Sequence, residues 1–151
     1  GDVLQEHSDK KAILVSHSIL KKPVGSNSNY IPHEGKDSVM SSFTRQGKSI
    51  YHHFKKYGNI FLMLCGHISG EGYRVETYQG NTIRMYLADY QSRRNPPYTE
   101  NDRNGGNGLM RLMKFNLADK TISVRTIAPE ADGSFKEETD EDSRFTHPLP
   151  F

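Results

Sequence analysis

Two short apolar runs that each end in a histidine constrain the fold of this chain more than any other feature. Residues 12–16 lead into His17, and residues 60–66 lead into His67. A continuous apolar run of this length predicts a strand buried on both faces, as in a parallel sheet. Open α/β sheets place their functional sites at the carboxyl ends of such strands. The pattern therefore predicts that two imidazoles meet at one edge of a sheet.

The rest of the chain predicts a mixed architecture, of the α+β or α/β class, with about one main helix. Turn-forming residues fill 23–44, and apolar residues at helical spacing predict a helix over 49–57. Beyond His67 the pattern has period two, and a last edge strand is expected over 145–151. We expect mostly one mixed sheet that continues into an antiparallel meander of four strands, over residues 73–78, 82–89, 109–116 and 121–127.

Composition limits the size of the fold and the kind of partner. With 151 residues the chain is long enough for one domain. Its net charge of +2, from 20 basic and 18 acidic residues, predicts no nucleic-acid partner. No apolar stretch approaches the roughly 20 residues that cross a bilayer, so we expect a soluble protein without a membrane segment. The compartment stays open, secreted and periplasmic locations included.

His17 and His67 are the first candidates for chemistry. A neutral imidazole at a rigid strand end suits Zn, Mn or Fe, and Gly66 allows the chain to turn sharply before His67. The alternative for either histidine is an ordinary hydrogen-bonded side chain. Their matching positions favour the metal interpretation.

The two long loops hold further candidates. His33 lies where it could approach a leaving group, and Arg103 could bind phosphate through its guanidinium. Asn104, Gly105 and Gly106 give the second loop the backbone freedom to approach a substrate closely. For each of these residues the alternative is a solvated loop position.

The order of several short segments resembles the carboxyl-terminal half of calcineurin-like metallophosphoesterases. The resemblance rests on the two histidine-terminated runs and extends over nearly the whole chain, through residues 13–17, 64–70, 87–91, 104–111 and 142–146. It implies part of a four-layer αββα sandwich, whose strand-end loops bind a pair of divalent metal ions. It also implies hydrolysis of phosphate esters, with Mn, Fe or Zn as the metal.

Compared residue by residue, His17 matches the lone histidine that this family supplies as a metal ligand from a strand end. His67 matches the first histidine of the family's Gly-His-x-His motif, and Ser69 stands where the second histidine would be. The resemblance thus implies that one expected ligand is absent, or that the site is a variant with weaker binding, a water in place of the ligand, or one metal ion only.

The amino-terminal motifs of the family, such as Asp-x-His and Gly-Asn-His-Asp, do not occur in this sequence. Residues 1–151 are therefore expected to be the carboxyl-terminal half of one domain, inactive by itself. The expected partners are a phosphorylated substrate and the missing amino-terminal half. Because half of a two-sheet sandwich leaves an apolar face uncovered, self-association is expected as well.

Two other functions remain open. A set of polar strands with aromatic and asparagine-rich loops is also typical of a β-rich carbohydrate-binding or protein-interaction module, in which both histidines would be incidental. The serine at position 69 would also suit a degenerate phosphoesterase that serves as a scaffold. Metal binding that depends on both histidines would distinguish the enzyme from the binding module.

Overall fold

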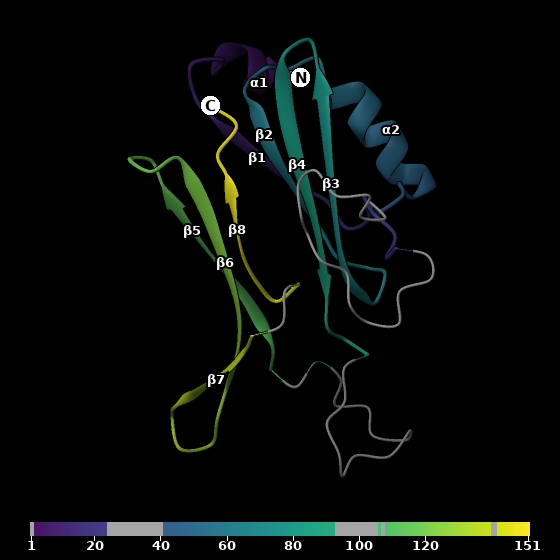
Figure 1. Ribbon diagram of the computed structural model, residues 1–151. Coiled ribbons are helices and arrows are strands. Elements are labelled where there is room, and N and C mark those ends of the chain that lie inside the picture. The colour runs from purple at the N-terminus through teal and green to yellow at the C-terminus, as the bar shows by residue number, and fades with distance from the viewer. Residues whose placement is uncertain (1, 24–40, 93–105, 107, 140–141) are drawn as a thin grey trace.

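The computed structural model describes residues 2–23, 41–92, 106, 108–139 and 142–151 (Figure 1). The described helices and strands are, in chain order, α1 (Asp2–Glu6), β1 (Ala12–Val15), α2 (Arg45–Phe54), β2 (Ile60–Cys65), β3 (Gly70–Tyr78), β4 (Asn81–Asp89), β5 (Met110–Asn116), β6 (Thr121–Pro129), β7 (Phe135–Glu138) and β8 (Arg144–Pro148). Neither helix in these ranges combines the length and the apolar composition that a bilayer crossing requires.

The first sheet is mixed and has the strand order β1-β2-β4-β3. β1, β2 and β4 run parallel to one another, and β3 pairs antiparallel with β4. The carboxyl ends of three adjacent parallel strands therefore lie at one edge of this sheet, which is where α/β sheets carry their sites.

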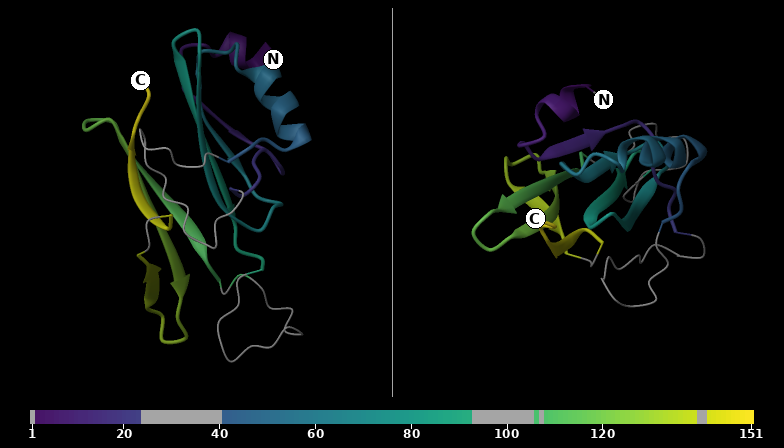
Figure 2. Two further views of the ribbon diagram at one scale, coloured as in Figure 1. Left: turned by 45° about the vertical axis from the view of Figure 1, so that its right-hand side comes forward. Right: turned by 90° about the horizontal axis from the view of Figure 1, so that it is seen from above.

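Helix α2 packs on one face of the first sheet (Figures 1 and 2). Thr44 caps its start, because its side-chain oxygen accepts a hydrogen bond from the Gly47 amide at 2.9 Å. Tyr51 is buried between the helix and the sheet, in a cluster with Met63 and Met85. The helix predicted over 49–57 is confirmed in its buried face, but it begins and ends several residues earlier.

The second sheet is antiparallel and is organised around β6. β5 pairs with one edge of β6, and β7 and β8 share the other edge, one after the other. Strands β3, β4, β5, β6 and β8 were predicted, although their ends differ by a few residues. β7 was not predicted, because its charged Phe-Lys-Glu-Glu sequence has no apolar face.

The two sheets pack face to face (Figures 1 and 2). Polar contacts run through this layer: the Tyr86 hydroxyl lies 2.9 Å from His147 Nδ1, and Arg84 donates to the Tyr73 hydroxyl at 2.7 Å and to the Pro148 carbonyl at 2.8 Å. The apolar members are buried residues of both sheets, namely Phe61, Leu62, Tyr73, Tyr86, Ile122, Val124 and Leu149.

The expectation of mostly one mixed sheet with a continuous meander is wrong, because the described strands form two four-stranded sheets. The hairpins β3–β4 and β5–β6 were expected to be neighbours in one sheet, yet they belong to different sheets that face each other. Alternation of apolar and polar residues specifies the face that each strand buries and not the sheet that it joins. α2 and the two sheets are three of the four expected layers, so the complete sandwich stays a prediction.

The expectation that the first run is buried on both faces is also wrong. β1 is an edge strand, and its side chains alternate between half-buried and exposed. Ala12 and Leu14 pack toward the helix side, whereas Ile13 is 43% and Val15 is 74% exposed on the opposite face. A strand with the sequence of a central strand thus lies at the edge of the sheet that the described residues form.

Candidate functional site

The carboxyl ends of β1 and β2 bring His17 and His67 together. Val15 and Leu64 are partners in the parallel register, and the Ser16 amide donates to the Leu64 carbonyl at 3.0 Å. One step further along, the Gly66 amide donates to the His17 carbonyl at 3.2 Å. The pairing thus extends past both strands to the two histidines. Their side chains are exposed, and their ring centroids lie 4.4 Å apart.

The two rings are neighbours at this sheet edge. Their centroids lie 4.4 Å apart with planes inclined by 52°, a tilted ring contact. Imidazole nitrogens bind Zn²⁺ at about 2.0–2.1 Å, so two ligands of one ion require nitrogens at most about 4.2 Å apart. The prediction that two imidazoles meet at this sheet edge is confirmed. Their role as metal ligands stays a prediction.

His67 has a strained backbone. Its φ is +70°, in the region that favours glycine, and the Ile68 amide donates to the Gly66 carbonyl at 2.9 Å across it. This is the geometry of a γ-turn with positive φ, which is rare and strained. Such strain persists only where the surroundings hold it, and it concentrates at functional sites. The turn places the His67 ring beside the His17 ring.

Asp89 ends β4, the third parallel strand, and the sequence analysis did not select it as a site residue. A Cβ atom added at Gly66 would lie 3.7 Å from Asp89 Oδ2, so this carboxylate approaches the backbone next to His67. Its Oδ1 accepts a hydrogen bond from the Gln91 amide at 3.0 Å. The signal in the sequence was an acidic residue at the end of a strand, which alternation alone does not distinguish from a surface residue.

The other predicted site residues are less informative. Ser69 is half-buried in the turn after His67. Gly106 has a φ of +91°, and a Cβ atom there would lie 3.6 Å from the Tyr90 carbonyl oxygen, so the loop backbone packs against the chain that leaves β4. Four predicted residues lie outside the described ranges, namely His33, Arg103, Asn104 and Gly105.

The donor set of the described residues fits a metal ion only in part. They contain no group of three or more His, Cys, Asp or Glu side chains arranged to hold an ion. A tetrahedral catalytic zinc site needs three protein ligands and one open position. His17 and His67 can therefore supply two ligands. Further ligands would have to come from residues outside the described ranges or from another chain.

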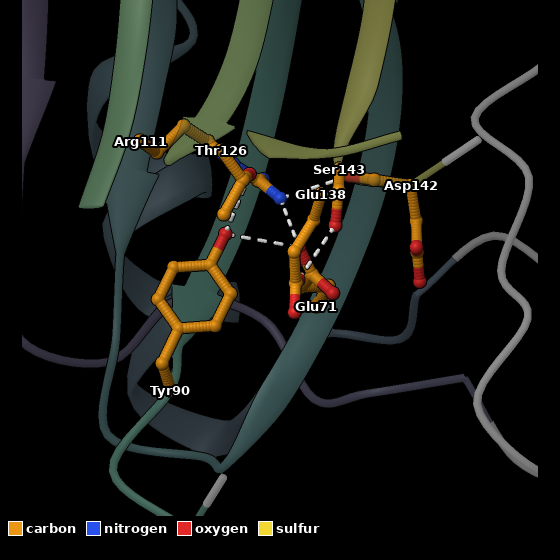
Figure 3. A network of polar contacts seen from close by, with 7 residues as sticks. All are labelled: Glu71, Tyr90, Arg111, Thr126, Glu138, Asp142 and Ser143. Atoms are coloured by element: carbon orange, nitrogen blue, oxygen red, sulfur yellow. Dashed lines mark hydrogen bonds and ion pairs between the residues drawn. The ribbon is translucent and has the colours of Figure 1, made fainter. Parts of the chain in front are cut away.

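A buried polar cluster lies next to this sheet edge and was missed by the sequence analysis (Figure 3). Glu71 on β3 accepts a hydrogen bond from the Tyr90 hydroxyl at 2.9 Å and forms an ion pair with Arg111 on β5. The Tyr90 hydroxyl also lies 3.1 Å from the Thr126 hydroxyl on β6. We call these four residues, Glu71, Tyr90, Arg111 and Thr126, the Glu71 cluster. It joins the first sheet to the second.

Burial determines the protonation of Tyr90 and limits the screening of the ion pair between Glu71 and Arg111. Removal from water, opposed by the nearby Arg111 and reinforced by Glu71, raises the pKa of Tyr90 to about 12. The phenol therefore stays a hydrogen-bond donor over the whole physiological range. The side chains of Glu71 and Arg111 are only 3% and 8% exposed, so their ion pair is weakly screened by solvent.

Contacts from the last part of the chain extend the Glu71 cluster (Figure 3). Arg111 donates a second hydrogen bond, of 2.9 Å, to the Asp142 backbone carbonyl. The next residue, Ser143, donates to the Glu138 carboxylate at 3.2 Å. The segment that leads into β8 is thereby attached to the same point between the sheets.

No model of a known protein family matches the chain, and neither does any curated protein.

Proposed function

We propose that the chain is part of a metal-dependent phosphoester hydrolase, a phosphatase or phosphodiesterase in which His17 and His67 are ligands of a divalent ion. The observation that carries the proposal is the pair of exposed imidazoles, 4.4 Å apart, at the ends of adjacent parallel strands. Scattered surface histidines would not require the strained turn at His67.

The residues at the sheet edge have different roles in this proposal. The His17 backbone is held by pairing that continues beyond β1 and β2, because the Gly66 amide donates to the His17 carbonyl at 3.2 Å. His67 depends on the turn, and Asp89 adds negative charge near the Gly66 backbone, which favours a cation. Mn, Fe or Zn would polarise a phosphoryl oxygen and lower the pKa of a bound water. A phosphorylated substrate would approach from the exposed side of the two rings.

The remaining ligands would come from an amino-terminal half of the same domain, the partner expected from the resemblance. Two features of β1 support such a partner. Its outer edge has no neighbouring strand among the described residues, and Ile13 and Val15 are exposed apolar side chains on one of its faces. A further strand beside β1 would use the free backbone groups. The chain by itself is then a binding scaffold with an incomplete site.

A metal titration tests the proposal. The chain is titrated with Co²⁺ or Zn²⁺ by calorimetry, and the double variant His17→Ala/His67→Ala is compared with His52→Ala/His53→Ala. The control variant removes two exposed histidines from α2, away from the strand ends. We expect one ion per chain in the wild type and in the control, and no binding in the first variant. Equal affinities in both double variants would contradict the metal site.

A second titration tests the phosphoester part of the proposal. Inorganic phosphate is added to the chain with and without the ion, and we expect binding only with the ion present. Phosphate binding that does not need the ion would refute the link between site and substrate. A carbohydrate bound with equal affinity by the wild type and by His17→Ala/His67→Ala would favour the binding-module alternative.

A further inference from the structure

We propose that the Glu71 cluster is a positioning device for the strand-end site, and that it holds the His67 turn beside His17 and the Asp89 carboxylate beside the Gly66 backbone. This inference rests on the proposed function, because positioning matters only if the two histidines bind a ligand. Glu71 and Tyr90 are positioning residues here and would not touch the ion.

The first argument is the position of the cluster along the chain. Gly70 and Asp89 are partners in the β3–β4 register. Glu71 follows Gly70 directly and lies four residues after His67, and Tyr90 follows Asp89 directly. The hydrogen bond from Tyr90 to Glu71 therefore joins the residue that follows Asp89 to the residue that follows Gly70. Fixing these two side chains limits the movement of the backbone on which His67 and Asp89 are carried.

The second argument is that the partners of Glu71 and Tyr90 in the cluster come from the other sheet. Arg111 belongs to β5 and Thr126 to β6, and both contact residues at this end of the first sheet through the Glu71 cluster. Arg111 also donates to the Asp142 carbonyl at 2.9 Å. The start of β3 and the residue after β4 are thus joined to the second sheet as well as to their own.

The third argument is that the strained turn at His67 is held on both sides. On one side the Gly66 amide donates to the His17 carbonyl at 3.2 Å. On the other side Ile68 packs against the core beside α2, and the chain enters β3 at Gly70, which is paired with Asp89. Glu71 follows Gly70, is buried, accepts a hydrogen bond from Tyr90 and pairs with Arg111. Loss of this anchor would loosen the start of β3 and allow the strained turn to relax, which carries the His67 ring away from His17.

If the Glu71 cluster only joined the two sheets, its loss would not affect the strand-end site. The chain offers a matched control for that case. Tyr86 is another buried tyrosine between the sheets, and its hydroxyl lies 2.9 Å from His147 Nδ1. Tyr86→Phe and Tyr90→Phe each remove one buried hydroxyl from the same layer. Only Tyr90→Phe breaks a contact to Glu71.

Two measurements on these variants test the proposal. Zn²⁺ affinity is measured by calorimetry, and hydrogen exchange of the Gly66 and Ile68 amides is measured without metal. We expect Tyr90→Phe to weaken Zn²⁺ binding by about tenfold, the lower end of what outer-shell changes cause. We also expect it to accelerate exchange at both amides. Tyr86→Phe should leave affinity and exchange at these two positions unchanged.

The outcomes separate this inference from the proposed function. Equal effects of Tyr90→Phe and Tyr86→Phe in both measurements would overturn the positioning role. A wild-type chain that binds no Zn²⁺ overturns the metal site, yet the exchange measurement still decides whether the Glu71 cluster holds the turn. If Tyr90→Phe does not fold, Thr126→Val removes the second partner of the Tyr90 hydroxyl, and it should shift both readouts in the same direction by less.

Discussion

Replacement of Arg111 by methionine tests whether the buried ion pair stabilises the fold. The side chains of Arg111 and Glu71 are 8% and 3% exposed, so Arg111→Met leaves a carboxylate buried without its guanidinium. Breaking such a pair typically costs about 3–5 kcal/mol, a large part of the roughly 5–15 kcal/mol that stabilises a domain. The melting temperature should fall by on the order of 10 °C.

The chain contains an exposed pair of the same residue types as a control. Arg125 and Glu137 also form an ion pair, but their side chains are 57% and 21% exposed. Arg125→Met should cost much less than Arg111→Met, because solvent already screens this charge. The comparison keeps the substitution constant and changes only the burial.

Urea unfolding followed by circular dichroism gives the free energies of unfolding. The double variant Arg111→Met/Glu71→Gln removes both charges and should recover about 1–3 kcal/mol of the loss, the usual coupling between contacting residues. The reasoning is refuted if Arg111→Met loses no more than Arg125→Met, or if the double variant is as unstable as the sum of its two single variants.

Four further expectations follow from single residues. Because burial raises the pKa of Tyr90 to about 12, the folded chain keeps a proton that the unfolded chain releases near pH 10. About 2–3 kcal/mol of stability should therefore be present below pH 10 and be lost as the pH rises toward 12, and Tyr90→Phe should remove this part of the pH dependence in urea unfolding. Gly47→Ala should lower the melting temperature sharply, because its Cβ would lie 1.9 Å from a backbone carbonyl oxygen, whereas Gly58→Ala, with nothing within 4 Å, should be neutral. Val15→Lys should reduce any self-association seen in light scattering, since Val15 is 74% exposed on β1, which has no outer neighbour among the described strands. His67→Gly should raise the free energy of unfolding by about 1 kcal/mol while weakening Zn²⁺ binding, because glycine adopts a positive φ without strain; a loss of stability would contradict the strained turn.

Local patterns in the sequence predicted the elements better than their assembly. The apolar run before His67 and the alternation after it located β2, β3 and β4 within a few residues. Both patterns express which side chains are buried, and burial repeats with the period of the element. The meeting of His17 and His67 was predictable for a similar reason, because parallel strands end at the same edge.

Contacts between distant residues were not predictable from these patterns. Glu71 and Arg111 are separated by 40 residues. Glu71 lies outside the strand predicted over 73–78, Arg111 lies within the strand predicted over 109–116, and neither was selected as a site residue. Their pairing depends on how the second sheet packs against the first. The spacing of apolar residues along each strand does not specify that packing. The edge position of β1 was missed because an apolar run shows that a strand can be buried and does not show that a neighbour is present.

The strand directions indicate where further ligands of the proposed site would have to come from. The site lies at the carboxyl ends of β1, β2 and β4, which are parallel. β3 bounds the sheet on the other side and runs antiparallel, so its carboxyl end lies at the opposite edge of the sheet. A strand that pairs with β1 and runs parallel to it would place its carboxyl end, and any ligand there, beside His17. Among the described residues the outer edge of β1 has no neighbouring strand. A strand of the proposed amino-terminal half would therefore account both for the apolar sequence of β1 and for the incomplete set of ligands.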